Sequence, residues 1–105
     1  MPLVPSGLVK QRELASGVKR AEQALAPDVV RIRYSVGADW TGEQSIFFRI
    51  ILSDAVSRPE RLLKIVQRVE SKLLKEVKAE ELGLQAYFNF RSVSEQAKLK
   101  EPSWA

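Results

Sequence analysis

The fold is decided by residues 29–53, which read VVRIRYSVGADWTGEQSIFFRIILS. Residues 29–36 alternate apolar and polar side chains with a period of two, as in a strand that buries one face. Residues 45–53 form a second strand, which is apolar on one face and mixed on the other. Residues 37–43 lie between them and contain the Gly and Asp residues that are typical of turns. The stretch therefore predicts a β-hairpin.

The alternation assigns the side chains of this hairpin to two faces, because neighbouring residues of a strand point in opposite directions. The apolar face is expected to be the core, and it holds Val30, Ile32, Tyr34, Val36, Ile46, Phe48, Ile50 and Leu52. The second face holds Arg31, Arg33, Phe47, Arg49 and Ile51.

Two helices are predicted to flank the hairpin. Residues 7–26 carry apolar residues at helical spacing and are followed by Pro27, which cannot continue a helix. Residues 58–80 carry a second apolar stripe, and Ser57 and Glu60 have the spacing of a capping box at its start. Gly83 is the expected stop after this helix.

A third strand is expected over residues 84–91, with a short helix and tail over residues 92–105. The predicted fold class is α+β, a two-layer sandwich in the order α-β-β-α-β plus the short C-terminal helix. We expect a three-stranded antiparallel sheet of order 3-1-2 with both long helices on one face. Residues 1–105 are expected to form one domain, in which residues 1–6 are a flexible N-terminus.

This order of elements is similar to that of type II KH domains and of ribosome-binding-factor-like proteins. A KH domain clamps nucleotides with a G-x-x-G loop, and that pattern is absent from the sequence. The resemblance is in element order and assigns the chain to no family.

Composition excludes much familiar chemistry. The chain of 105 residues has no cysteine and no histidine, so no disulfide, imidazole ligand, cysteine nucleophile or histidine base is available. Gly37 and Gly42 match the glycine spacing of a phosphate-binding loop, but Glu43 stands where its lysine belongs. Asp39, Glu43 and Asp54 are not expected to converge on a metal. We therefore expect no enzyme, no cofactor and no metal site.

The second face of the sheet is the main candidate site. The third strand adds Tyr87, Asn89 and Arg91 to it, so that arginines lie among aromatic residues. This composition suits a protein interface, and it also suits RNA, whose bases stack on rings and guanidinium planes. A third interpretation is that the C-terminal segment, with Leu99 and Trp104, folds back and covers the face.

Two further features point to binding. Trp40 stands in the hairpin turn, where it is either an exposed anchor or packed against a helix end. A basic stripe follows the second helix opposite its apolar side, and it consists of Arg61, Lys64, Arg68, Lys72 and Lys75. Such a stripe either follows a phosphate backbone or is a plain solvated face.

The hypothesis from the sequence is a small accessory, regulatory or antitoxin-like protein that binds a protein partner. The alternatives are RNA binding on the same face and a structural homodimer. The net charge of +4 is compatible with each of these. No run of 18 apolar residues is present, so no membrane span is expected and a cytoplasmic location is the default. The residues expected to bind the partner are Arg31, Arg33, Phe47, Arg49, Ile51, Tyr87, Asn89, Arg91 and Trp40.

Overall fold

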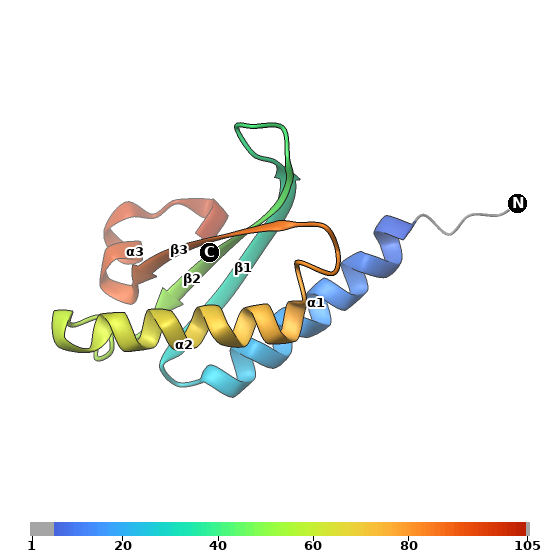
Figure 1. Cartoon of the computed structure of the whole chain (residues 1–105). Coiled ribbons are helices and arrows are strands. Elements are labelled where there is room, and N and C mark those ends of the chain that lie inside the picture. Colours follow the sequence, from blue (N-terminus) through green and yellow to red (C-terminus); the bar gives the residue numbers. More distant parts are fainter. Residues whose placement is uncertain (1–5, 105) are drawn as a thin grey trace, which may run out of the picture.

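The computed structural model describes residues 6–104 (Figure 1). Its elements are α1 (Ser6–Leu25), β1 (Val29–Ala38), β2 (Gln44–Leu52), α2 (Pro59–Val77), β3 (Gln85–Ser92), α3 (Val93–Leu99) and a short 3-10 helix, η1 (Pro102–Trp104). The α+β class and the order of elements are as predicted. Residues 1–5 of the N-terminus predicted to be flexible lie outside the described residues, and Ser6 already belongs to α1.

The sheet is mixed, with the order β1-β2-β3. β1 and β2 form the predicted antiparallel hairpin, in which Ile32 faces Ile50 and Tyr34 faces Phe48. β3 lies beside β2 and runs parallel to it. The prediction of an antiparallel sheet of order 3-1-2 was therefore wrong, although the crossover through α2 does make β3 parallel to β2.

The amino-acid composition of the strands explains this order. β2 is the most apolar strand and occupies the centre, where it is flanked on both sides. β1 carries charged residues that suit an edge strand, which must avoid pairing with other chains. On this edge the Glu22 side chain of α1 accepts a hydrogen bond of 2.8 Å from the backbone N–H of Ile32. A third strand on that side would have to displace this bond.

A β-bulge corrects the predicted face of the first strand. The register of β1 against β2 shifts between Val29 and Arg31, so one additional residue is accommodated there. Val29 is consequently in the core at 2% exposure, whereas Val30 is 50% exposed. Val36, near the far end of the hairpin, is also exposed.

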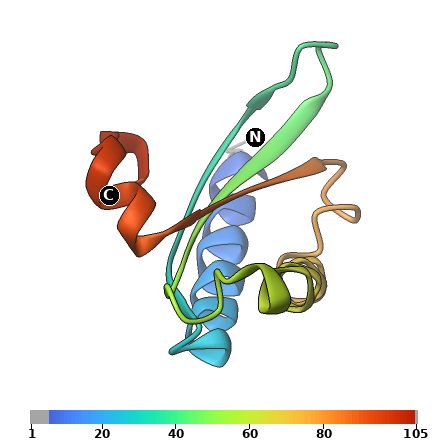
Figure 2. The same cartoon turned by 90° about the vertical axis from the view of Figure 1, so that its left-hand side faces the viewer.

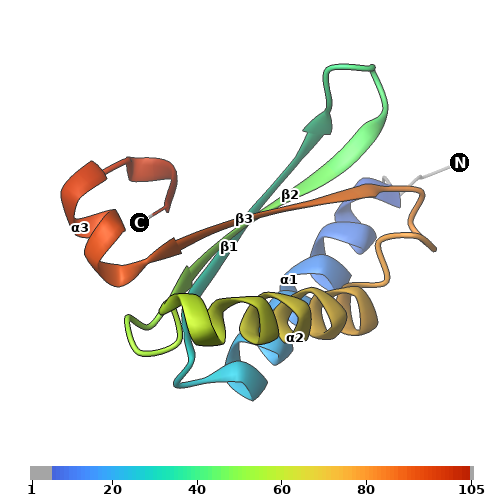
Figure 3. The ribbon, with the colours of Figure 1, turned by 60° about the vertical axis from the view of Figure 1, so that its left-hand side comes forward.

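The two long helices cover one face of the sheet, as predicted, while α3 and η1 lie on the other face (Figures 2 and 3). A two-layer description is therefore incomplete, because the C-terminal elements add to the second face. The core between the sheet and the long helices is formed by buried apolar residues that include Leu14, Val18, Leu25, Ile32, Ile46, Phe48, Ile50, Val69 and Leu73.

Helices α1 and α2 approach each other closely at Gly17. A Cβ at this position would lie 2.6 Å from the backbone oxygen of Glu76. Arg20, one turn further along α1, donates a hydrogen bond of 3.0 Å from Nε to Oε2 of Glu76. A glycine in the middle of α1, which costs about 1 kcal/mol in helix propensity, is thus required by the contact between the helices.

The predicted capping box of the second helix was wrong. α2 begins at Pro59, its N-cap is Arg58, and no side chain caps it. Ser57 instead belongs to the preceding turn, where its hydroxyl donates to the backbone oxygen of Ser53. The helix ends at Val77, where Lys78 adopts a left-handed conformation, several residues before Gly83.

Candidate interaction site

The strand register brings the eight predicted sheet residues and Ser35 together on the second face in three rows. Arg31, Ile51 and Arg91 form the row nearest to α3, Arg33, Arg49 and Asn89 form the middle row, and Ser35, Phe47 and Tyr87 form the row nearest to the hairpin turn. Parallel pairing of β3 with β2 preserves the period-two pattern, so the composition of this face is correct although the predicted strand order was not.

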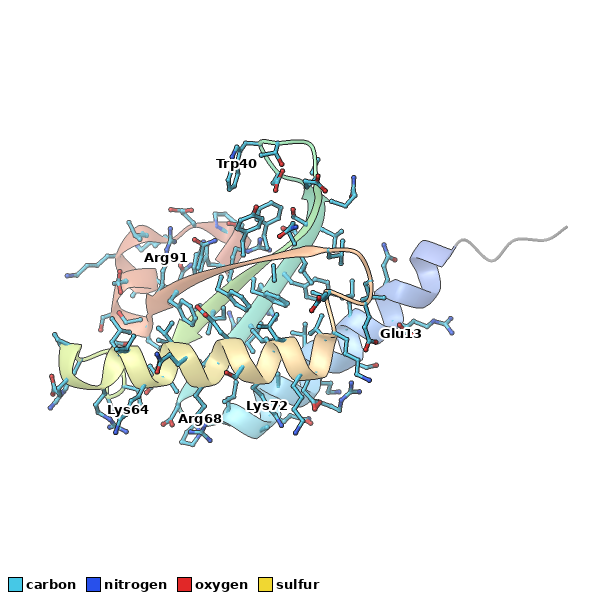
Figure 4. The ribbon with its side chains drawn as sticks, viewed as in Figure 1. Glu13, Trp40, Lys64, Arg68, Lys72 and Arg91 are labelled. Atoms are coloured by element: carbon cyan, nitrogen blue, oxygen red, sulfur yellow. The ribbon has the colours of Figure 1, made fainter. Side chains whose placement is uncertain are left out.

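Three aromatic rings form a cluster at the hairpin end of this face. Phe47 and Tyr87 are stacked, with ring centroids 5.3 Å apart and an interplanar angle of 15°. Trp40 also contacts Tyr87, with ring centroids 5.3 Å apart and an interplanar angle of 52°. Figure 4 shows Trp40 on the turn above the sheet, directed back toward the strands. We call Trp40, Phe47 and Tyr87 the aromatic cluster.

Trp40 does not pack against a helix end, which was one of its two predicted placements. Its side chain remains 81% exposed although it contacts Tyr87. Phe47 and Tyr87 are half-buried. The cluster therefore presents a large apolar surface to solvent at a defined position.

Asp39 holds this arrangement in place. Its Oδ1 accepts hydrogen bonds from the Thr41 hydroxyl at 2.6 Å and the Thr41 backbone N–H at 2.8 Å. Its Oδ2 accepts a hydrogen bond of 2.7 Å from the Tyr87 hydroxyl. One carboxylate thus joins the turn to β3, a role of Asp39 that was not predicted from the sequence.

The same bonds change the acid–base properties of both groups. The hydrogen bond from the Thr41 hydroxyl is the largest cause that holds the pKa of Asp39 far below its usual range. Burial, the second largest, raises this pKa, and the bond from Tyr87 lowers it further. The hydrogen bond to Asp39 is likewise the largest cause that raises the pKa of Tyr87. Asp39 is therefore a carboxylate, and Tyr87 a neutral phenol, at neutral pH.

The opposite end of the face is covered by the chain itself. The guanidinium of Arg91 lies 4.3 Å from the ring centroid of Trp104, and its Nη2 is 2.8 Å from Oε1 of Glu101. Arg49 donates a hydrogen bond of 2.8 Å from Nε to the backbone oxygen of Ser103. Ile51 points to this face and is only 5% exposed. Because both long helices lie on the other side, its cover comes from α3 and η1.

The C-terminal segment therefore covers part of the face, as one of the three interpretations proposed. Trp104 is buried, whereas Leu99 remains 52% exposed and adds little to the cover. The partners of the arginines in this segment, Glu101 and the Ser103 carbonyl, were missed by the sequence analysis. Their sequence carries no periodic signal that would place them on the sheet.

The basic stripe lies on the opposite side of the molecule. Lys64, Arg68 and Lys72 point from α2 away from the sheet (Figure 4). Arg68 lies 3.4 Å from the carboxylate of Asp28, and Lys72 lies 3.9 Å from that of Glu76. Part of the positive charge of the stripe is thus balanced by neighbouring acidic residues.

The acidic residues considered for a metal site lie apart. Asp54, at the α3 end of the sheet, accepts a hydrogen bond of 2.6 Å from the Ser94 hydroxyl, which is the largest cause that lowers its pKa. Asp39 lies at the other end, in the turn. Within residues 6–104, no three acidic side chains gather around a position that a metal ion would fit. The helices of the same range include none that is long and apolar enough to cross a membrane.

Comparison with known protein families and with curated proteins gives no match to this chain.

Proposed function

We propose that the protein is a non-catalytic interaction module, an accessory, regulatory or antitoxin-like subunit that binds a protein partner through the aromatic cluster. The observation that carries this proposal is Trp40, which is 81% exposed and yet held in position by Tyr87. Trp and Tyr dominate the binding energy of protein interfaces. A ring that is already positioned loses little conformational freedom when it binds.

The surroundings of the cluster supply the polar rim that such an interface needs. Arg33 and Asn89 stand in the row beside Phe47 and Tyr87, and both are exposed. Glu43 lies in the same turn as Trp40 and is also exposed. Groups of both charges therefore surround an apolar centre, so that a partner surface of mixed charge is suited to it.

RNA suits this surface less well. Arg49 and Arg91, two of the four arginines of the face, already bind Ser103, Glu101 and Trp104 within the chain. The carboxylate of Asp39 lies within hydrogen-bond distance of Tyr87, where a stacked nucleotide would bring a phosphate near. Both features oppose the phosphate contacts on which RNA affinity depends.

The proposal of a non-catalytic role rests on the residues available. The chain has neither histidine nor cysteine. A general base works best with a pKa near neutral pH, and the carboxylate beside the cluster, Asp39, has a pKa far below that.

Affinity capture with the full chain from a lysate of its source organism tests the proposal, with bound protein and nucleic acid both quantified. Trp40→Ala is expected to weaken retention of the partner by roughly 30-fold, which corresponds to about 2 kcal/mol for a central interface residue. The matched control is Leu63→Ala, because Leu63 is an apolar residue of α2 that is 68% exposed. This control is expected to retain the partner.

Retention of the same proteins by Trp40→Ala as by the unchanged chain would show that the cluster is not the interface. Retention of RNA that is lost steeply as salt is raised would replace the proposal with the RNA alternative. Retention of a second copy of the same chain, checked by sedimentation, would show that the protein is a homodimer.

A further inference from the structure

The segment that covers the α3 end of the face is held there by side chains of the sheet. Within the described residues, the hydrogen bonds that join two backbone groups in residues 100–104 are local: the N–H of Lys100 donates to the backbone oxygen of Gln96, and that of Trp104 donates to the backbone oxygen of Glu101. The contacts to the sheet come from Arg49 and Arg91. The segment is therefore bound as a peptide ligand is bound, and not as an additional strand.

The connection to the rest of the chain is also suited to release of this segment. α3 has no buried residue. Lys100 adopts a left-handed conformation with φ of 51°, which turns the chain back toward the sheet. Trp104 is the buried residue of η1, so one apolar anchor and two arginines hold the segment, together with the Gln96 side chain of α3, which donates a hydrogen bond of 3.0 Å to the backbone oxygen of Glu101.

Each contact recognises a definite chemical group. Arg91 binds a carboxylate through Nη2 and an aromatic ring through its guanidinium plane, and it belongs to β3. Arg49 of β2 binds the backbone carbonyl of the residue before the aromatic one, which any residue supplies. Ile51 provides a buried apolar surface on the same face.

We propose that Arg49, Ile51 and Arg91 form a peptide-binding site for a segment in which an acidic residue precedes an aromatic residue by three positions. Residues 101–104 of the chain, Glu-Pro-Ser-Trp, occupy this site, and a segment of the same pattern from another protein displaces them. The site is separate from the aromatic cluster, so the proposal does not depend on the proposed function.

Replacement of residues 101–104 by a second segment is energetically favoured over their release to leave the site empty. The Arg91 side chain is only 17% exposed while the segment lies on it, and release of the segment would remove both its ion pair with Glu101 and its contact with the Trp104 ring. An opened site would also expose Ile51 and Trp104 to water. A competing segment that restores the same contacts avoids both costs.

The test uses the full chain in which Glu101→Ala and Trp104→Ala vacate the site. The probe is a fluorescently labelled peptide with the sequence of residues 98–104, KLKEPSW, and binding is followed by fluorescence anisotropy. We expect the vacated chain to bind this peptide, and the unchanged chain to bind it at least about tenfold more weakly, because its own segment competes at millimolar effective concentration. The control peptide KLKAPSA is expected not to bind.

Two substitutions in the vacated chain locate the bound peptide. Arg91→Ala is expected to weaken binding at least about tenfold, whereas Trp40→Ala is expected to leave it unchanged. Equal binding by the vacated and unchanged chains, no binding by either, or loss of binding with Trp40→Ala in place of Arg91→Ala would overturn the proposal.

A second measurement does not depend on the folding of the vacated chain. The unlabelled peptide is titrated to millimolar concentration into the unchanged protein, and the two indole N–H resonances are followed by NMR after assignment with Trp40→Phe. Displacement predicts that the Trp104 resonance moves to the position of an exposed indole. A Trp104 resonance that stays in place at saturating peptide contradicts displacement.

Discussion

Asp39 links the hairpin turn to β3 at the candidate site. Its two carboxylate oxygens bind Thr41 on the turn and Tyr87 on β3, so the position of Trp40 depends on them. A residue in this role is recognisable in the structure because its pKa is strongly lowered, whereas in sequence it is one more turn aspartate.

The Asp39 to Tyr87 bond predicts how the hairpin end responds to pH. The folded pKa of Tyr87 is raised, so this bond stabilises the folded state below the unfolded tyrosine pKa of about 10 and is lost as the pH rises through the folded value. The folded pKa of Asp39 is lowered, so its contribution is present above the unfolded aspartate pKa of about 3.9 and is lost as the pH falls through the folded value. Both contributions are present at neutral pH.

Asp39→Asn is therefore expected to lower the pKa of Tyr87 toward its usual value of about 10. The measurement is an absorbance titration at alkaline pH in a Tyr34→Phe background, in which Tyr87 is the remaining tyrosine. Asp54→Asn, which removes a carboxylate at the opposite end of the sheet, is the control and should leave the titration unchanged. An unchanged Tyr87 titration in Asp39→Asn would mean that the bond does not persist in solution.

At the scale of elements, the features that depend on neighbouring residues were easier to predict than those that depend on pairing between distant segments. The hairpin depends on residues close in sequence and was predicted correctly. The capping box of α3, in which Ser92 and Glu95 bind each other's backbone N–H, is equally local. The position of β3 depends on whether it pairs more favourably with β1 or with β2. That choice is made between segments that are distant in sequence. The bulge at Val30 was missed for the same reason, because its cause lies in the pairing between strands.

The crossing of α1 and α2 leads to a stability prediction. Gly17→Ala gains about 1 kcal/mol of helix propensity, but its Cβ would meet the backbone oxygen of Glu76 at 2.6 Å. Because the backbone of Glu76 cannot rotate away as a side chain could, α1 and α2 must move apart. Overpacking of this kind costs about 1–3 kcal/mol. We expect a net loss of about 1 kcal/mol in the free energy of unfolding, measured by urea denaturation.

Gly37→Ala is the matched control for this substitution. No atom lies within 4 Å of the Cβ that it would add in β1. It is expected to be neutral or to stabilise by up to about 1 kcal/mol. If both substitutions have the same effect, the close approach at Gly17 does not limit packing.

At the scale of the whole molecule, the sheet separates two surfaces of different character. The aromatic cluster and the peptide-covered end lie on one side, and the basic stripe of α2 lies on the other (Figures 3 and 4). One compact ligand therefore cannot contact both surfaces without extending around the protein.

The separation predicts that charge on α2 is irrelevant to the proposed partner. Lys64→Glu together with Lys75→Glu is expected to change partner retention less than about twofold, while Trp40→Ala lowers it roughly 30-fold. Affinity capture as described above, at two salt concentrations, measures both effects. A large loss of retention in the lysine variants would assign the partner to the basic stripe.

The sequence by itself determined the elements, their order and, apart from Val29 and Val30 at the bulge, which strand residues share a face of the sheet, because turns and period-two alternation arise from neighbouring residues. It also excluded histidine and cysteine chemistry outright. The tertiary structure alone decided that β2 is central, that Asp39 binds Tyr87 beside Trp40, and that the segment with Glu101 and Trp104 covers part of the second face. These features depend on side chains that are distant in sequence and meet only after the chain has folded, so no local pattern records them.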